Sequence, residues 1–485
     1  MIAVIDCGLS SLKLSLIDEH GSSIEVATER YPTRYAAERA EQDPGDWWRA
    51  LVRAASRLQR RSKIRALVAT GHMHGLVLLG ARSRPLLPCL TLHDRRGAEL
   101  MSDLDPDWFY TKTGQLLDAS LPITKLLWLR QARPELLARA TCLLAPKDYL
   151  RLLLTGERHT EHVDAAGTGL YDLAARGWSP ELVALTGIPP SALAPIVESA
   201  SVSGRLTGKA ATALGLPTRI PVVAGAGDDV ELLGATRHRG GMAVEHVGTT
   251  GSILVRAERA GVDPAGRVEI SPTCVPHIFA AGGSTSNAGS VISWIEEKLD
   301  VSLEDAVRAR GNHLVALPYL FGERATVRLP FASGAVLGLG AATDRSDVAH
   351  SLLVGVAFGL RDLFELLSSL VGRIDELVSS GLGSSSPDWV RLRAAAYGMP
   401  ISVVSSDPTA VGCAAIAIAA LDGDNPEQVA LAFSADRATL EPDARIVDEM
   451  QDAFHRYQEL RNTLLPLYVA AGREAGDRST EVLSR

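Results

Sequence analysis

Apolar and polar positions along the first half of the chain predict strands and helices in alternation. Residues 2–17 are apolar on both sides of a small-residue turn, Gly8-Leu9-Ser10-Ser11, which predicts a β-hairpin. In residues 43–60 the apolar positions fall at helical spacing. Short apolar runs at 64–69 and 76–79 then flank a polar stretch. This alternation is typical of an α/β protein.

The second half of the chain opens with the same pattern as the first. Residues 242–255 predict another hairpin, with Gly248-Thr249-Thr250-Gly251 at its turn. Residues 347–370 predict a long, largely apolar helix, and residues 376–396 predict a strand, a turn and a helix. An Ala-rich helix is expected at 410–421. The repeated hairpin predicts two related domains.

A polar, Gly-containing connector at residues 237–241 marks the expected domain boundary. We place the first domain at residues 1–237 and the second at 238–471, followed by a polar tail at 472–485.

Composition and charge narrow the class of protein. With 46% hydrophobic and 22% charged residues, the chain has the balance of a globular protein. Its 49 Lys and Arg against 57 Asp and Glu give a net charge of −8 without basic blocks, which argues against nucleic-acid binding. No apolar run reaches the roughly 20 residues of a membrane helix, and the N-terminus makes a poor signal peptide. Five scattered cysteines without a C-x-x-C pair predict reduced thiols and a cytoplasmic protein.

Two hydroxyl-rich glycine turns, one in each half, suit phosphate binding. The first contains Gly8, Ser10 and Ser11, and the second is Gly248-Thr249-Thr250-Gly251. Glycine lets the backbone approach an anion, while N–H groups and hydroxyls supply donors. The alternative is that each is only a hairpin turn.

Charged residues on both sides of the first turn extend this hypothesis. Asp6 precedes the turn and Lys13 follows it. A carboxylate can hold Mg²⁺ directly or through water, and a cation can offset phosphate charge. Together they predict a corner that binds a nucleotide and a metal ion.

The segment Gly225-Ala-Gly-Asp228-Asp229 places a carboxylate after a strand and at the start of a helix. Asp228 is either the N-cap of that helix or a base that accepts a hydroxyl proton during attack on a γ-phosphate. Asp229 and Glu231 are interpreted as charges favoured by the helix dipole.

Two further segments carry polar side chains that suit a polyol. Met73 and His74 lie in His72-Met73-His74-Gly75, where further zinc ligands at suitable spacing are lacking, so hydrogen bonding to a polyol or ordinary packing is expected. Asp94 and Arg96 follow an apolar run and either bind hydroxyls or form a surface ion pair.

A small, donor-rich loop in the second half contains Gly381, Gly383 and Ser384. It suits the adenosine part of a nucleotide, or it is a flexible connector. Neither a P-loop nor a G-x-G-x-x-G after the first strand is present.

Taken in order, a series of segments resembles the FGGY family of carbohydrate kinases, over almost the whole chain. The markers are Asp6-Cys-Gly8-Leu-Ser-Ser-Leu-Lys13, Ala145-Pro-Lys-Asp-Tyr-Leu150, Leu154-Thr-Gly156, Asp164-Ala-Ala-Gly-Thr168, Gly227-Asp228, Gly248-Thr-Thr-Gly251, Pro318-Tyr-Leu-Phe-Gly-Glu-Arg324, Gly381-Leu-Gly383 and Ala410-Val-Gly412-Cys-Ala-Ala415. The resemblance implies a two-domain, actin-like (ribonuclease-H-like) ATPase fold with an interdomain cleft.

The resemblance also implies roles for the candidate residues. Asp228 would be the catalytic base and a ligand of Mg²⁺, which Asp6 would help to position. Met73-His74-Gly75 looks like the triplet with which xylulose kinases contact the ketose. Asp94 and Arg96 match the end of the family's Trp-x-Asp-x-Arg pattern beside the sugar. The N-terminal domain would then hold the sugar.

For the nucleotide, the resemblance implies a binding surface in the C-terminal domain together with the first phosphate turn. The residues expected to hold ATP are Gly8, Ser10, Ser11, Lys13, Gly248, Thr249, Thr250, Gly251, Gly381, Gly383 and Ser384.

Three positions depart from the family pattern. Leu9 replaces the usual Thr in the first turn and removes a hydroxyl donor. Leu92 replaces the usual Trp beside the sugar, and Asp229 stands where xylulose kinases commonly have Asn. The last two changes bear on which sugar is used.

The expected reaction is phosphorylation of a ketose hydroxyl by ATP, with D-xylulose as the first candidate. Closure of two domains would align the hydroxyl with the γ-phosphate and exclude water. One alternative is a kinase for another polyol (ribulose, sedoheptulose, ribitol, erythritol or glycerol), and a second is a non-catalytic actin-like nucleotide-binding protein. A third alternative is a sugar-binding regulator. The net negative charge and the lack of a helix-turn-helix pattern argue against this third alternative. A homodimer is compatible with the sequence.

Overall fold

The chain forms two compact units, neither of which is one continuous stretch of sequence. The computed structural model describes residues 1–235, 241–261, 263, 265–309, 313–324, 329, 331–404, 407–433 and 437–482, without the side chains of Asp228, Leu382 and residues 472–482. Unit 1 comprises Met1–Arg239, Ala257–Ala280 and Ser406–Asp436, and unit 2 comprises Gly240–Arg256, Ala281–Ser405 and Arg437–Arg485. The connector predicted at 237–241 lies outside the described residues except for Gly241.

Unit 1 is built on a mixed sheet of six strands. In spatial order these are β14 (Val202–Arg205), β15 (Pro221–Val223), β6 (Ala66–Gly71), β1 (Ile2–Cys7), β2 (Ser11–Ile17) and β3 (Ser23–Arg30). The N-terminal hairpin is confirmed, because β1 and β2 pair antiparallel from Ile2 opposite Ile17 to Cys7 opposite Leu12. β6 runs parallel to both β1 and β15.

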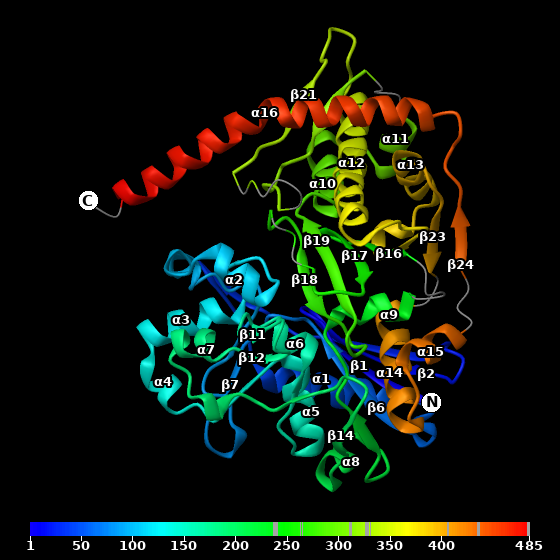
Figure 1. Cartoon of the computed structure of the whole chain (residues 1–485). Coiled ribbons are helices and arrows are strands. Elements are labelled where there is room, and N and C mark those ends of the chain that lie inside the picture. Colours follow the sequence, from blue (N-terminus) through cyan, green and yellow to red (C-terminus); the bar gives the residue numbers. More distant parts are fainter. Residues whose placement is uncertain are drawn as a thin grey trace. The chain divides into compact units, whose positions relative to one another are not determined.

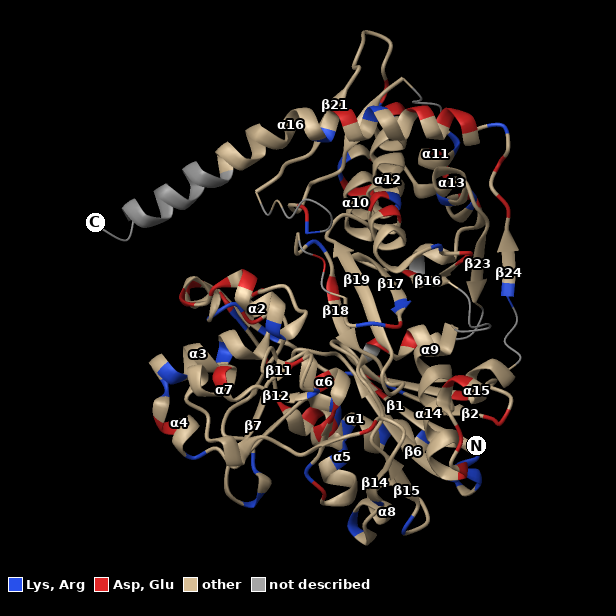
Figure 2. Ribbon diagram, viewed as in Figure 1, with Lys and Arg blue, Asp and Glu red and all other residues tan. Residues whose placement is uncertain are grey.

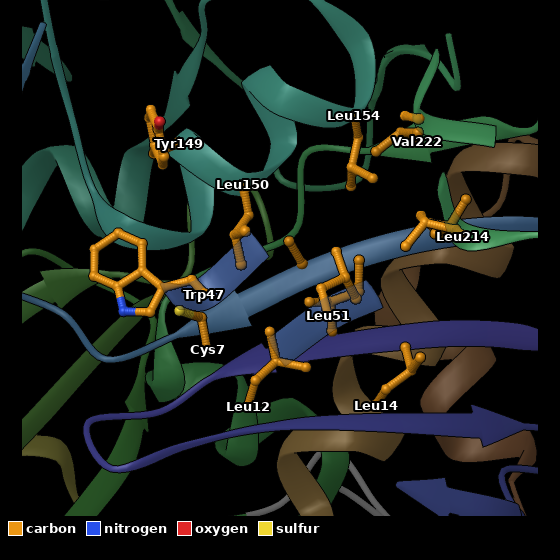
Figure 3. Close-up of a cluster of buried hydrophobic side chains, with 14 of the residues drawn as sticks. Cys7, Leu12, Leu14, Trp47, Leu51, Tyr149, Leu150, Leu154, Leu214 and Val222 are labelled. Atoms are coloured by element: carbon orange, nitrogen blue, oxygen red, sulfur yellow. The ribbon is translucent and has the colours of Figure 1, made fainter. Parts of the chain in front are cut away.

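Helices cover both faces of this sheet, so its central strands are apolar on both sides. On one face, Ile5 and Cys7 pack with the helices α1 (Pro44–Arg57), α5 (Pro146–Thr155) and α8 (Gly208–Leu214). Figure 3 shows this cluster around Trp47 of α1. On the other face, Ile2 and Val4 pack against α14 (Pro408–Asp422). The result is a three-layer α/β/α unit (Figure 1).

The remaining elements of unit 1 surround a second core of leucine side chains or lie beside the sheet. The helices are α2 (Pro106–Thr113), α3 (Pro122–Ala132), α4 (Pro134–Ala138), α6 (His162–Ala166), α7 (Pro180–Thr186), α9 (Glu231–Ala235) and α15 (Pro426–Ala432). The strands are β4 (Arg34–Ala36), β5 (Arg39–Gln42), β7 (Val77–Leu79), β8 (Cys89–Leu90), β9 (Cys142–Leu144), β10 (Thr160–Glu161), β11 (Tyr171–Asp172), β12 (Gly177–Trp178), β13 (Ile196–Val197) and β18 (Glu269–Pro272).

Unit 2 repeats the strand pattern of unit 1. Its own strands follow the order β19 (Phe279–Thr285), β17 (Gly251–Ala257), β16 (Met242–Val247), β22 (Glu376–Ser380), β23 (Ile401–Val404) and β24 (Arg437–Leu440). The second predicted hairpin is confirmed, since β16 pairs antiparallel with β17. As with β1 and β6, β16 then runs parallel to β22.

The described residues of unit 2 also form five α-helices and a small hairpin. They are α10 (Gly289–Trp294), α11 (Leu303–Arg308), α12 (Arg345–Val371), α13 (Pro387–Tyr397), α16 (Val447–Val482), β20 (Val315–Leu317) and β21 (Ala335–Leu337). α12 confirms the long apolar helix expected at 347–370. Acidic residues begin α16, and both acidic and basic residues follow in its first half (Figure 2); this helix continues into the stretch predicted as a polar tail. Within the described residues, no helix has the length and apolar character needed to cross a membrane.

Candidate active site

Three of the predicted site segments leave the sheet of unit 1 at the same edge. The parallel strands β1, β6 and β15 end at Cys7, Gly71 and Val223. They lead into the first phosphate turn, the Met73-His74 loop and the segment that ends at Asp228. Because parallel strands have their carboxyl ends at one edge, these segments lie together, and such edges commonly bind ligands.

Side chains outside the predicted motif hold the first phosphate turn. The hydroxyl of Tyr31 donates to the carbonyl of Gly8, and the Gln42 amide donates to the carbonyl of Leu9 at 2.5 Å. Gln42 is itself fixed by the indole N–H of Trp47 at 3.0 Å. The turn is therefore rigid although Leu9 removes a hydroxyl, and the Ser10 side chain remains exposed.

A three-membered charge cluster lies behind the first turn. Lys13 Nζ is 3.4 Å from a carboxylate oxygen of Asp6 and also bonds Asp407. Burial alone would lower the pKa of Lys13, but Asp407 and Asp6 outweigh it and raise that pKa. Burial, with Asp407 nearby, raises the pKa of Asp6, while Lys13 opposes the rise.

The third member of this cluster, Asp407, was not found by sequence analysis. It caps α14, accepting the backbone N–H of Thr409 at 3.1 Å. The Asp-Pro pair before an Ala-rich run indicates a helix start. Nothing in that local pattern indicates a contact with Lys13.

The catalytic residue expected at Asp228 lies at the start of a short 3₁₀ turn, Asp228–Val230, that leads into α9. Its side chain is outside the described residues, so both interpretations of it stay predictions. Among the described side chains no group of three or more His, Cys, Asp or Glu is arranged to hold a metal ion.

Close packing of α9 on α14 fixes the segment that carries Asp228. A Cβ added to Gly234 would lie 1.7 Å from the carbonyl oxygen of Pro408. One added to Gly412 would lie 2.3 Å from the carbonyl oxygen of Val230. Only glycine permits this approach.

Asp229, interpreted from the sequence as a charge at the start of a helix, also makes a side-chain contact outside that helix. Its carboxylate accepts a hydrogen bond from the Ser271 hydroxyl at 3.3 Å. Burial, together with Glu231, raises its pKa to about 6. Asp229 therefore titrates near neutrality, a property that Asn at this position would not have.

Met73 lies between two glycines that leave room for its side chain. A Cβ on Gly167 would lie 2.7 Å from Met73 Cε, and one on Gly227 would lie 2.8 Å from Met73 Cγ. Since Gly227 immediately precedes Asp228, this packing joins the Met73-His74 loop to the segment expected to carry the base.

The two histidines of the loop have different surroundings. His72 is buried, lies edge-on to Trp47 with ring centroids 6.2 Å apart, and has a pKa lowered by burial to about 4. His74 is half-buried, has a left-handed backbone (φ 64°), and places Nδ1 3.3 Å from the Ser120 hydroxyl. Of these two histidines, only His74 has a partly exposed side chain.

Asp94 and Arg96 form a buried ion pair rather than one at the surface. The Asp94 carboxylate accepts two guanidinium hydrogen bonds, at 3.0 and 2.7 Å, and the N–H of Ala40 at 3.0 Å. Arg96 also bonds Glu41 at 2.6 Å and stacks over Trp128 at 4.3 Å. Because its oxygens are engaged, Asp94 orients Arg96.

A buried charge cluster next to His74 was not assigned a role from the sequence. Lys147 lies 2.8 Å from Asp148, 3.3 Å from Glu161 and 3.0 Å from Asp164. Asp164 lines a small cavity with His74. Burial raises its pKa to about 7, against the opposing effect of Lys147.

The second phosphate turn is fixed by the start of α10. The carbonyl of Gly248 accepts the N–H of Gly289 at 3.0 Å, and that of Thr249 accepts the N–H of Ser290 at 2.9 Å. The Thr250 side chain stays exposed, while Gly251 is buried. The exposed hydroxyl and the turn's backbone suit an anion.

The predicted loop at Gly381–Ser384 lies against the end of β16, beside the second turn. A Cβ on Gly381 would lie 2.8 Å from the Val247 carbonyl oxygen, and one on Gly383 would lie 2.4 Å from Val247 Cγ1. Ser384 donates to the carbonyl of Ser380 at 3.0 Å. The structure thus brings together the two segments of unit 2 that were predicted to hold a nucleotide.

A buried ion pair that sequence analysis missed supports this loop. Arg393 on α13 donates to Glu245 on β16, to Ser379 at 3.0 Å and to the carbonyl of Gly383 at 3.1 Å. Tyr397 also donates to Glu245, at 2.8 Å. No local sequence signal pairs these residues.

Comparison with known proteins places this chain among sugar-phosphorylating enzymes. Residues 1–233 match the N-terminal domain of the FGGY family of carbohydrate kinases, and residues 244–421 match its C-terminal domain. A xylulose kinase of Bacillus subtilis (strain 168) is 28% identical over 94% of this chain and 95% of its own. A gluconokinase of the same organism is 25% identical over 83% of this chain and 84% of its own.

Among solved structures, a crystal structure of a xyloylose kinase from Brucella ovis has the same fold. It is 30% identical and superposes with a TM-score of 0.90, covering 96% of this chain and 99% of that one. The match extends over both units, so the fold predicted from the sequence is confirmed.

Proposed function

Because the chain belongs to the FGGY family of carbohydrate kinases, we propose that it transfers the γ-phosphate of ATP to a hydroxyl of a ketose, with D-xylulose as the preferred substrate. The observation that carries this proposal is the shared sheet edge in unit 1. There a phosphate turn, the Met73-His74 loop and the Asp228 segment follow three neighbouring parallel strands. A phosphate donor, a polyol and a base are what the reaction requires.

In the proposed mechanism Asp228 accepts the proton of the attacking hydroxyl. Met73 and His74 hold the sugar, with the thioether against its carbon skeleton and the imidazole on a hydroxyl. Arg96, oriented by Asp94, donates to further hydroxyls. These groups align the nucleophile, and alignment supplies much of the catalysis in phosphoryl transfer.

The nucleotide is proposed to bind both glycine turns and the Gly381–Ser384 loop. Backbone N–H groups and the hydroxyls of Ser10, Ser11 and Thr250 would donate to phosphate oxygens, with Lys13 adding positive charge. Mg²⁺ accompanies ATP in this proposal. The part-exposed carboxylate of Asp6 beside a phosphate turn fits such an ion, which keeps several waters, and Asp228 is the second candidate. When bound, the ion would neutralise phosphate charge.

Electrostatics favour a neutral polyol over a sugar acid. Besides Asp228, the Met73-His74 loop has Asp164 beside it, and Asp229 directly follows the proposed base along the chain. A substrate carboxylate would be repelled by each of these carboxylates in its ionised form. For this reason we place D-gluconate, the substrate class suggested by the gluconokinase relative, second to a ketose.

We also propose a cytoplasmic location. Cys7, Cys89, Cys142, Cys274 and Cys413 are free and buried. Burial raises the pKa of the Cys89 thiol to about 12, so this thiol stays protonated and unreactive. Free cysteines without disulfides are typical of proteins in a reducing compartment.

The test is ADP release by the purified protein with Mg-ATP over a panel of ketoses, polyols and D-gluconate. Asp228→Asn should lower turnover with the best substrate about 10³-fold or more while ATP binding is retained. Asp229→Asn, which introduces at the following position the residue that is common in xylulose kinases, is the matched control and should retain most turnover. Equal loss of turnover and ATP binding in Asp228→Asn would assign Asp228 a structural role. A lack of stimulation by every compound would contradict the proposed kinase activity.

A further inference from the structure

The backbone of His74 has a conformation that needs support. His74 has a φ of 64°, in the left-handed region that residues with a Cβ rarely adopt. The same residue directs its ring towards Ser120, with Nδ1 3.3 Å from the hydroxyl. Strained residues of this kind persist only where neighbouring groups hold them.

The group that holds His74 is a buried lysine on α3. Lys125 is 0% exposed, and its Nζ donates to the carbonyl of His74 and to the carbonyl of Ser120, each at 2.6 Å. One ammonium group thus bonds the backbone of both His74 and Ser120, whose side chains contact each other through the His74 imidazole. Among the described residues, no carboxylate lies within 4.0 Å of this Nζ.

Burial of this lysine is unfavourable for the charged form. Burial lowers the pKa of the Lys125 ammonium group to about 7. The charges that act on it from neighbouring elements are Cys89, Asp94 and Asp118, which oppose the fall, and Arg95, which adds to it. A methionine or leucine would fill the same volume without this penalty, so the two carbonyl contacts are what distinguish lysine here.

We propose that Lys125 is a positioning residue for the sugar site: by tying the carbonyls of His74 and Ser120 to one ammonium group, it fixes the left-handed backbone of His74 and the direction of its imidazole. The inference rests on the proposed function, in which His74 binds the sugar. It assigns to Lys125 no contact with the substrate.

The main test is a double-mutant cycle on the sugar kinetics. Lys125→Met removes both hydrogen bonds and keeps the volume, and we expect it to raise the KM for the best sugar about tenfold, with the KM for ATP unchanged. In a His74→Ala background, which has no imidazole to orient, Lys125→Met should have little further effect. Lys112→Met, which removes a half-buried lysine paired with Asp172, is the control and should not alter either KM.

Two results would overturn the inference. One is an unchanged sugar KM in Lys125→Met, and the other is an equal rise in KM with and without the His74 ring, which is the signature of a purely structural lysine. Lys125→Gln retains two N–H donors and serves as a second variant if Lys125→Met does not fold. Its sugar KM should lie between those of the wild type and the methionine variant, and a KM equal to or above that of His74→Ala would contradict the proposal.

A spectroscopic readout separates this inference from the proposed function. In ¹⁵N-labelled protein, with the His74 ring assigned by its loss in His74→Ala, Lys125→Met should shift the ring nitrogen resonances, whereas Lys112→Met should not. If these resonances shift but no sugar stimulates ADP release, the positioning role stands and the proposed function falls. If sugars stimulate ADP release but the resonances and the KM are unchanged, the positioning role falls alone.

Discussion

Gly412 on α14 offers a direct test of how packing positions the segment proposed to carry the catalytic base. A Cβ at this position would lie 2.3 Å from the carbonyl oxygen of Val230 and 3.0 Å from the backbone nitrogen of Gly234. Ordinary contact begins at 3.4 Å, so Gly412→Ala would force α14 and the Asp228–Val230 turn apart by about 1 Å.

The size of the effect follows from two opposing terms. Overpacking of a core costs about 1–3 kcal/mol, whereas alanine in place of glycine in a helix interior gains up to about 1 kcal/mol. We therefore expect Gly412→Ala to be less stable by about 1–2 kcal/mol, which lowers Tm by about 2–3 °C for a unit of this size. A displacement of about 1 Å at a catalytic group lowers turnover about 100-fold.

The assay compares Gly412→Ala with Gly208→Ala, at the exposed start of α8, where an added Cβ meets nothing within 4 Å. Calorimetry gives Tm, and ADP release with Mg-ATP and the best sugar gives kcat. Gly208→Ala should match the wild type in kcat and change stability by less than about 1 kcal/mol. If both variants behave alike, the close contact between α9 and α14 does not position the Asp228 segment, and the reasoning fails.

Two buried charges give further predictions of opposite sign. Burial raises the pKa of Asp164 from 3.8 to about 7, so folding of the wild type becomes less favourable as pH rises through this range. At pH 8, Asp164→Asn should therefore be more stable than the wild type by at most about 4 kcal/mol. Urea unfolding at a series of pH values should show this difference in stability vanish towards pH 4. A difference that does not change with pH would contradict the role of burial. Arg393→Met leaves Glu245 buried without its cation and should lower the free energy of unfolding by about 3–5 kcal/mol. The double variant, in which Met replaces both residues, should lose less stability. A larger loss in the double variant, measured by urea unfolding, would contradict this prediction.

Elements whose signal is local could be predicted from the sequence. Both hairpins, at 2–17 and 242–255, and the helix expected at 347–370 are present. Alternating or helical spacing of apolar residues selects the element, and a turn of small residues fixes where the chain reverses. The candidate phosphate turns were found for the same reason, because a glycine-and-hydroxyl turn is complete within four residues.

The candidate site was predictable only in part. His74 was assigned to the sugar only through the family resemblance, because the local pattern His72-Met73-His74-Gly75 does not by itself distinguish its two histidines. Packing gives the two histidines different surroundings, since His72 is buried beside Trp47 while His74 is half-buried and held in a left-handed conformation. The pair of Asp94 and Arg96 was visible in the sequence, yet its burial depends on residues from other strands.

The sequence by itself determined the alternation of strands and helices, the two hairpins with their glycine-and-hydroxyl turns, and the ordered markers of the family. Each of these depends on residues close together along the chain. Tertiary structure alone decided that Asp407 bonds Lys13, that Lys125 joins His74 to Ser120, and that Arg393 reaches Glu245. A buried charge binds whichever polar group strand order and helix packing bring within about 3 Å, and that choice is not encoded in its neighbours along the chain.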